Sequence, residues 1–263
     1  MINREPTEYT PAPRRRGLGI VIVIAAIVLL ALRTLAGFWT DYLWFKSVDL
    51  VSVWSTRFWT TGAIVLVASL AAFGFLFGNL ILADRLSPRF RLVDLGDDEE
   101  VVERFSEWIE PRIRRVRLLL AAVFGVMLGI GTATLLDPVL SFLNASDFGI
   151  NDPEFGTDVG FFVFRLPLWR ELVNWSFQLV VATAILVAAL HYLNGGIRLR
   201  QGRAPEIGAG VRAHLSVLFA LLAIFKAGAY RLDTYELLSS PGGAVFGAGY
   251  TDVNARIPAL NLL

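Results

Sequence analysis

The stretch FWTTGAIVLVASLAAFGFLFGNLILA, residues 58–83, decides the fold of this chain because it contains no aspartate, glutamate, lysine or arginine. A helix needs about 20 apolar residues to cross a hydrocarbon core of roughly 30 Å, since lipid offers no hydrogen-bond partners to exposed backbone groups. Residues 118–136 and 172–197 are equally free of charge and also long enough. We therefore expect an all-α polytopic transmembrane bundle.

Two more stretches bring the expected number of spans to about five. Residues 17–40 are interrupted only by Arg33, whose long stem can reach toward the headgroups. Residues 211–230 reach a workable length if His214 and Lys226 lie near the two interfaces. The expected spans cover residues 17–40, 58–83, 116–136, 170–195 and 211–230.

Composition agrees with bilayer as the solvent and excludes several kinds of site. Apolar residues make up 55% of the chain, above the roughly 45–50% of soluble domains. The net charge of +1 gives no basic field for nucleic acid. The chain has no cysteine and only two histidines, which excludes disulfides, thiolate nucleophiles and Cys- or His-rich metal centres. We expect no cofactor and no metal.

The first apolar stretch has two interpretations. Three arginines, Arg14 to Arg16, precede it as in a secretory leader. No small-residue cleavage site follows, and the aromatic residues Phe38, Trp39, Tyr42, Trp44 and Phe45 are typical of an interfacial belt. The pattern favours an uncleaved anchor over a signal peptide.

Basic residues predict the orientation, because lysine and arginine near span ends are retained in the cytoplasm. Most of the 24 lysines and arginines precede the first span, separate the second from the third, or separate the fourth from the fifth. We expect a bacterial plasma-membrane protein with residues 1–16 as a cytoplasmic tail, residues 17–230 as the bundle, and residues 231–263 as an extracytoplasmic segment. Residues 97–110 open with acids, carry one apolar face and stop at Pro111, which predicts an amphipathic helix on the inner membrane surface.

Small and charged residues within the spans are the candidate sites. The pairs Gly74 and Gly78, and Gly125 and Gly129, form GxxxG motifs that let helices approach closely, either within the bundle or at a dimer face. Arg33 and Lys226 are the intramembrane charges. Lys226 either reaches the outer headgroups or forms an ion or proton site, for which Asp233 and Glu236 are within range if the helix continues outward.

Two further groups of residues have a functional and a plain interpretation. His191 and His214 fall near the inner ends of successive spans and could meet there, as a proton relay or as ordinary hydrogen-bonded residues. The outer loop, residues 137–169, carries the acids Asp147, Asp152, Glu154 and Asp158 among phenylalanines. Those acids could bind calcium, although their spacing matches no EF-hand, or simply lie in a solvated loop.

Several motifs together resemble a known family. They are WTDYLWF (39–45), NLILA (79–83) with SPRF (87–90), DPEFGTDVGFFVFRLP (152–167), YRLDTYELL (230–238) and GYTDVNARIPAL (249–260). In this order they resemble uncharacterised protein family 0182, a set of large bacterial membrane proteins. The resemblance implies a multi-pass plasma-membrane protein with about seven spans and a large outer region, so this chain is expected to be a C-terminally truncated form of its membrane region. It implies no catalytic residues.

Three functions remain open from the sequence. The leading hypothesis is a non-enzymatic membrane scaffold or envelope-associated component, with lipid, a second copy of the chain or other envelope proteins as partners. The second is a transporter or channel subunit, suggested by Lys226, Arg33 and the two histidines, although the middle of the spans is aliphatic. The third is an envelope enzyme that acts on a lipid-linked substrate, with the outer-loop acids Asp152 and Asp158 as acid and base.

Overall fold

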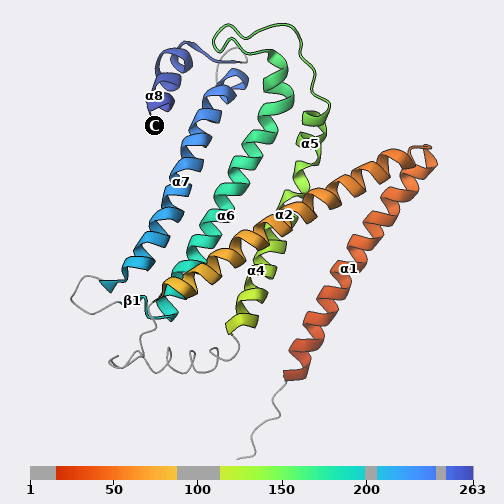
Figure 1. Ribbon diagram of the computed structural model, residues 1–263. Coiled ribbons are helices and arrows are strands. Elements are labelled where there is room, and N and C mark those ends of the chain that lie inside the picture. Colours follow the sequence, from red (N-terminus) through yellow and green to blue (C-terminus); the bar gives the residue numbers. More distant parts are fainter. Residues whose placement is uncertain (1–15, 88–112, 199–205, 241–246, 263) are drawn as a thin grey trace, which may run out of the picture. The chain divides into compact units, whose positions relative to one another are not determined.

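The computed structural model describes residues 16–87, 113–198, 206–240 and 247–262, and most of these lie in helices (Figure 1). The helices are α1 (Arg16–Ser47), α2 (Val51–Leu86), α4 (Ile113–Ile130), α5 (Leu136–Leu143), α6 (Leu166–Leu193), α7 (Ala209–Glu236) and α8 (Ile257–Leu262). Two short strands, β1 (Ile197–Arg198) and β2 (Glu206–Ile207), pair antiparallel between α6 and α7.

Five helical stretches in the described part of the chain are long and apolar enough to cross a membrane. They are Val21–Ser47, Val51–Leu86, Arg114–Leu143, Phe161–Leu193 and Ala209–Ser239. The predicted all-α class with about five spans is thereby confirmed. The amphipathic helix predicted over residues 97–110 lies outside the described residues.

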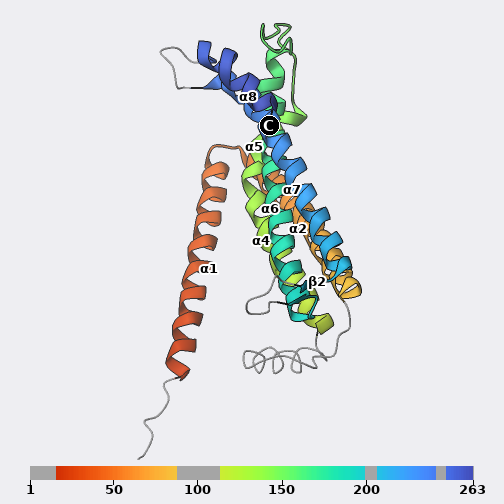
Figure 2. The same ribbon diagram turned by 90° about the vertical axis from the view of Figure 1, so that its left-hand side faces the viewer.

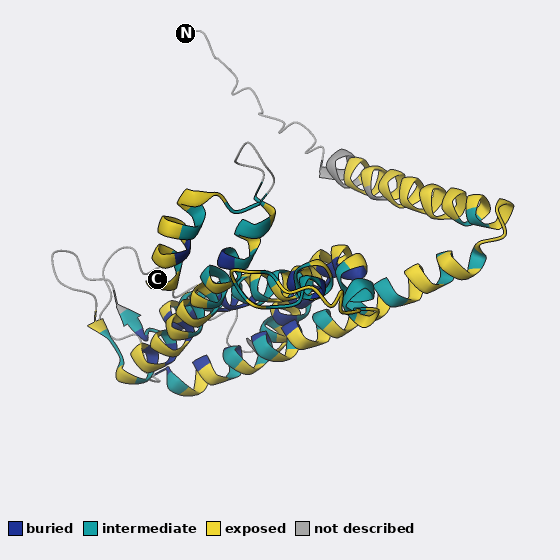
Figure 3. Ribbon diagram, turned by 90° about the horizontal axis from the view of Figure 1, so that it is seen from above, coloured by how far each residue is buried: buried dark blue, intermediate teal, exposed yellow. Residues whose placement is uncertain are grey.

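The apolar surface of these helices is largely uncovered by protein. Trp59 of α2 is 71% exposed and Leu29 of α1 is 67% exposed. The described part of α1 is exposed along nearly its whole length (Figure 3). A helix that is apolar all round and not buried by protein needs lipid around it.

Contacts divide the chain into two units between Phe58 and Trp59, within α2. In the first unit, aromatic rings join the end of α1 to the start of α2. Trp54 lies 5.0 Å from Phe38, 5.1 Å from Tyr42 and 5.6 Å from Phe58, ring centre to ring centre. The connecting turn places Asp49 at φ 57°, a left-handed conformation that aspartate tolerates better than most residues.

The second unit has its core between α2, α4, α6 and α7. One face of α2 contributes the buried residues Ala72, Leu76, Leu80 and Ala83, at the spacing that puts side chains on one side of a helix. The other core residues are Ala121, Leu179, Val180, Val187, Leu190 and Leu218. Within this unit α6 and α7 run antiparallel and side by side in two perpendicular views (Figures 1 and 2).

The third span is broken where the sequence predicted one continuous helix over residues 116–136. α4 ends at Ile130, a 3₁₀ turn covers Gly131–Leu135, and α5 follows. The Thr132 hydroxyl donates to the Gly129 carbonyl at 2.6 Å, and the Trp175 indole donates to the Leu128 carbonyl at 3.1 Å. Side chains that bond these carbonyls satisfy backbone groups in lipid where the helical pattern changes.

The two GxxxG motifs differ in their surroundings. A methyl group at Gly129 would lie 2.8 Å from the Ser69 Cα, and one at Gly125 would lie 3.0 Å from the Phe73 backbone nitrogen. These two glycines therefore let α4 cross α2 closely. A methyl group added at Gly74 or Gly78 would meet no atom of the described residues within 4 Å, apart from the neighbouring part of its own helix.

This contrast yields a prediction about packing. Gly129→Ala should lower the free energy of unfolding by about 1–3 kcal/mol, because the added carbon overpacks against the α2 backbone. Thermal unfolding of the purified chain in one detergent measures the change.

Gly74→Ala is the matched control, since it adds the same methyl group to a helix face without neighbours. It should leave the stability unchanged or slightly raised, because alanine is the better helix former. Equal effects of the two substitutions would show that α4 does not cross α2 at Gly129.

Candidate functional site

Polar side chains that connect α6 with α7 lie at the two ends of this helix pair. α6 carries Arg170 near its start and His191 near its end, roughly 30 Å apart at about 1.5 Å per residue. α7 runs the other way and carries His214 near its start and Asp233 near its end. The separation matches the thickness of a hydrocarbon core of about 30 Å, so each polar group falls at one interface.

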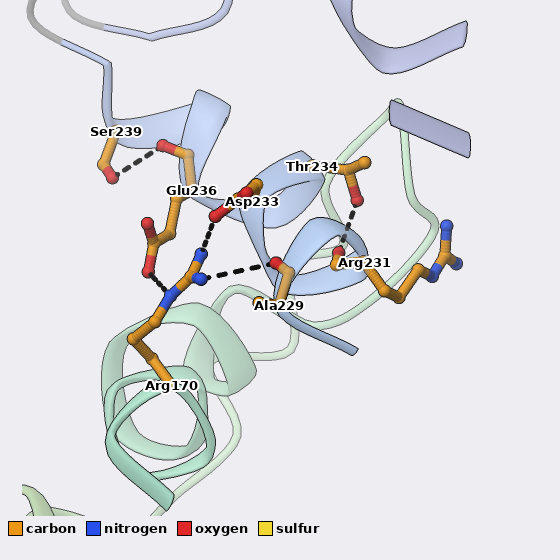
Figure 4. A network of polar contacts seen from close by, with 7 residues as sticks. All are labelled: Arg170, Ala229, Arg231, Asp233, Thr234, Glu236 and Ser239. Atoms are coloured by element: carbon orange, nitrogen blue, oxygen red, sulfur yellow. Dashed lines mark hydrogen bonds and ion pairs between the residues drawn. The ribbon is translucent and has the colours of Figure 1, made fainter. Parts of the chain in front are cut away.

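At one end, Arg170 of α6 forms a clamp on the last turns of α7. Its Nε donates to Glu236 and its Nη2 to Asp233, each at 2.5 Å, and its Nη1 donates to the Ala229 carbonyl at 3.3 Å. Figure 4 shows the guanidinium between the two carboxylates. The Arg170 side chain is 15% exposed, while its two acidic partners are about four-tenths exposed. We call these three side chains the arginine clamp.

The loop between α5 and α6 is folded at the same end of the helix pair (Figures 1 and 2). Asp158 accepts hydrogen bonds from the backbone amides of Phe148, Gly149 and Gly160 at 2.7–3.0 Å. These amides, with that of Phe148 contributing most, hold the pKa of Asp158 below its ordinary value. The carboxylate of Asp152 accepts two more, from Glu154 and Phe155.

Aromatic rings attach this loop to α7. The Tyr235 ring lies 4.9 Å from Phe155, 5.6 Å from Phe161 and 5.9 Å from Phe162, centre to centre, each edge to face. Such aromatic pairs each contribute about 0.5–1.5 kcal/mol beyond the burial of their area. Tyr235 lies between Asp233 and Glu236 in sequence, so one turn of α7 carries both the clamp and the rings. We call the loop, the rings and the clamp together the outer platform.

At the other end, four side chains form a hydrogen-bonded row, three of them on α2, α6 and α7 and the fourth, Ser87, directly after α2. Ser87 Oγ lies 2.9 Å from His191 Nδ1, and His191 Nε2 lies 3.2 Å from His214 Nδ1. His214 Nε2 lies 3.1 Å from Asn79 Oδ1. Both imidazoles are buried, His191 fully and His214 to all but 4%. We call this row the histidine row.

Helix ends position the histidine row. α6 stops in a motif in which Gly195, at φ 70°, donates to the Tyr192 carbonyl and Gly196 to the His191 carbonyl. On α7, a methyl group at Gly210 would lie 3.1 Å from the Leu86 carbonyl, so glycine lets the helix start close to the end of α2. His214 follows one turn later and reaches α2.

The structure places the charged residues expected within spans at exposed positions. Arg33 is exposed on α1. Lys226 is exposed on α7, with its ammonium 4.5 Å from the centre of the Tyr230 ring one turn further on. Although α7 continues outward to Glu236, both acids considered as partners of Lys226 pair with Arg170 instead.

Sequence reasoning brought the two histidines together but missed their neighbours. Asn79 lies on α2 and Ser87 directly follows that helix, both more than 100 positions from His191, and no local pattern marks them. Arg170 was also missed, although an arginine and a glutamate, Arg170 and Glu171, directly before a charge-free run were a visible signal. Gln178 lies exposed near the middle of α6 and lines an apolar groove with Phe124 and Ile185.

The outer-loop acids are engaged with backbone rather than with one another. Asp158 uses both carboxylate oxygens on amides, and Asp152 uses one in the same way. Among the residues that the structure describes, no group of three or more acids and histidines is arranged to hold a metal ion. The hydrogen bonds of Asp152 and Asp158 to backbone amides therefore order the loop between α5 and α6.

Comparison with known proteins places the chain among relatives of undefined function. The family model described as Uncharacterised protein family (UPF0182) matches residues 18–263. A UPF0182 protein of Salinispora arenicola is 38% identical over 259 residues, which cover 96% of this chain and 26% of that protein. A UPF0182 protein of Mycobacterium avium is 37% identical over 262 residues, or 98% of this chain and 26% of the relative. The chain thus spans about a quarter of the length of these curated relatives, and no solved structure matches it.

The low pKa of Asp158 gives a pH prediction for the loop. Because the folded-state pKa lies below the unfolded value of about 3.9, the bonds to Phe148 and Gly149 stabilise the loop above that pH. They are lost as the pH falls through the lower, folded-state value. The amide chemical shifts of Phe148 and Gly149 in micelles should therefore titrate below the ordinary aspartate range.

Asp158→Asn should abolish this titration, whereas Asp147→Asn, at an exposed neighbouring acid, should preserve it. A midpoint at or above the ordinary value would contradict the assignment.

Proposed function

The chain belongs to the Uncharacterised protein family (UPF0182), and from that premise we propose that it is a non-enzymatic scaffold of the bacterial plasma membrane. Its spans hold the outer platform at a fixed position on one face of the bilayer. The longer relatives contain a remainder that this chain does not match, and we propose that the segment after α7 leads toward it. The platform would set where and in which direction that remainder begins.

The observation that carries the proposal is that α6 and α7 are fastened to each other and to the loop at one end. A largely buried arginine that bonds two separate carboxylates and a backbone carbonyl fixes geometry more strongly than a single surface ion pair. The rings of Phe155, Phe161 and Phe162 against Tyr235 extend the fixed region into the loop. Such rigidity at a helix end suits a structural support.

The middle of the bundle favours a scaffold over a carrier. Carriers place polar groups or broken helices near the midplane. The third span is broken at Gly131–Leu135, but α6 and α7 are each continuous. The buried residues of α2, α6 and α7 are largely aliphatic, as Leu76, Val180 and Leu218 illustrate, and the buried hydroxyl of Thr183 donates within its own helix, to Leu179. The described polar contacts of α6 and α7 lie mainly toward the helix ends.

The loop likewise favours a structural role over an acid–base enzyme. A general acid needs a proton to give near neutral pH. Backbone amides stabilise the ionised form of Asp158, which is the opposite of what a general acid requires.

We also propose that the arginine clamp lies on the outer face and the N-terminus in the cytoplasm. The support is the distribution of basic residues. The segments rich in arginine adjoin the ends of α2 and α6 and the start of α7, at the histidine row. Positively charged segments of this kind are retained inside.

The proposal predicts that the clamp holds the platform. Arg170→Ala leaves two carboxylates unpaired and should destabilise the outer end by about 1–3 kcal/mol, the range for hydrogen bonds to charged groups. Chymotrypsin added to the chain in proteoliposomes should then cleave after Phe148 and Phe155 roughly ten times faster than in wild type.

Arg165→Ala is the control, because Arg165 forms only an exposed pair with Asp147 at 3.6 Å. It should leave cleavage nearly unchanged, as expected for a surface ion pair. Wild-type cleavage in Arg170→Ala would contradict the platform, and turnover of a lipid or glycan by the purified chain would contradict a non-enzymatic role.

A further inference from the structure

The histidine row is more elaborate than a packing contact requires, and its protons can be assigned atom by atom. The amide nitrogen of Asn79 donates to the Phe75 carbonyl at 2.8 Å, so the Asn79 oxygen faces His214. An oxygen without a proton can only accept. His214 Nε2 must therefore carry a hydrogen.

That first assignment fixes all the others when both rings are neutral. A neutral imidazole has one N–H, so His214 Nδ1 is bare and accepts from His191 Nε2. His191 Nδ1 is then bare in turn and accepts from the Ser87 hydroxyl. Every hydrogen bond runs in one direction, from Ser87 to Asn79, and each donor in the row meets an acceptor.

The row can also hold one more proton without moving a heavy atom. The Ser87 hydroxyl has a second acceptor, the Ala83 carbonyl, at 2.8 Å. If the hydroxyl turns to that carbonyl, His191 Nδ1 can take a proton and donate to Ser87 Oγ. The bonds from His191 to His214 and from His214 to Asn79 persist. The imidazolium has both of its N–H groups satisfied.

A second proton does not fit. With both rings protonated, His191 Nε2–H and His214 Nδ1–H would point at each other across 3.2 Å. Two donors without an acceptor between them repel, and both rings are buried. The row therefore has room for one extra proton and excludes two.

We propose that Asn79, Ser87, His191 and His214 form a binding site for a single proton, taken up from the side of the membrane that the histidine row adjoins. Ser87 directly follows the last residue of α2, and Asn194, at the end of α6, donates to its hydroxyl oxygen at 3.4 Å. Ser87 and Asn194 thus lie between the histidine row and the ends of α2 and α6, where a proton would enter. The proton binds at His191 Nδ1, and its charge can pass to His214 through their shared hydrogen bond.

Helix termini decide which ring carries the charge. His191 lies in the last turn of α6, where the partial negative charge of a helix end favours a cation. His214 lies early in α7, near the partial positive charge of a helix start. The site therefore holds its proton mainly on His191, next to Ser87.

Neighbouring charges do not neutralise the site. The charged or titratable groups at this end of α2, α4, α6, the strands and α7 are, among the described residues, Asp84, Arg85, Arg114, Arg115, Arg117, Tyr192, Arg198, Glu206 and Arg212. Asp84 is bound by Arg117 at 2.6 Å. Among the described residues, the one titratable group that acts electrostatically on His191 is His214. Proton uptake would therefore place an uncompensated charge where α2, α6 and α7 meet, which makes their contact sensitive to pH.

The chain has only two histidines, so nitrogen-15 labelling of histidine reports on the row alone. In lipid nanodiscs above neutral pH, both rings should be in the Nε2–H form. On acidification, one proton per chain should bind and both rings should respond at one midpoint. His191 Nδ1–H should appear first.

Two variants locate the site. Ser87→Ala removes the acceptor of the new N–H and should lower that midpoint by about one pH unit, a tenfold loss of proton affinity. Thr183→Ala removes an equally buried hydroxyl that donates only within α6, to Leu179, and should leave the midpoint unchanged.

The wild-type spectra test the proposal even if a variant fails to fold. An Nδ1–H form of either ring at high pH would overturn it. So would two protons bound at separate midpoints, or no titration before the chain unfolds.

Discussion

The structure depends on one constraint, that hydrocarbon provides no hydrogen bonds. Backbone groups must then pair within helices, and apolar side chains may remain uncovered by protein. α1 shows this most clearly, with its apolar residues exposed along its described length. The same constraint governs the polar side chains of α6 and α7, which are tied together at the helix ends, where Arg170 and His191 are separated by roughly the thickness of a bilayer core.

The two ends of the helix pair are fastened by different chemistry. The arginine clamp uses permanent charges, so it holds at any pH at which carboxylates are ionised. The histidine row uses neutral imidazoles, which carry a charge only when a proton binds. One end is therefore fixed, and the other can respond to its surroundings. In such a scaffold, a change of pH on the side of the histidine row would alter the contact of the helices there, and α6 and α7 would carry that change toward the other end.

Periodicity and charge predicted the helices well because a bilayer imposes long charge-free runs that sequence displays directly. They also placed His191 and His214 at one interface, since both adjoin the ends of successive spans. They could not distinguish Gly125 and Gly129 from Gly74 and Gly78, because identical motifs differ only in which side of the helix meets a neighbour. Nor could they assign Asp233 and Glu236 to Arg170, which lies more than 60 positions away and competes with the nearer Lys226.

The most direct test determines on which side of the membrane each end of the α6–α7 pair lies. Because the sequence has no cysteine, a single introduced cysteine is the only one that can be labelled. Ile150→Cys reports on the clamp end and Ala209→Cys on the histidine end, both at exposed positions. A membrane-impermeant maleimide applied to intact cells should label only Ile150→Cys, and Ala209→Cys should react only after permeabilisation. Labelling of both in intact cells, or recovery of the chain in the aqueous fraction without detergent, would contradict a bundle whose two polar ends lie on opposite faces of one bilayer.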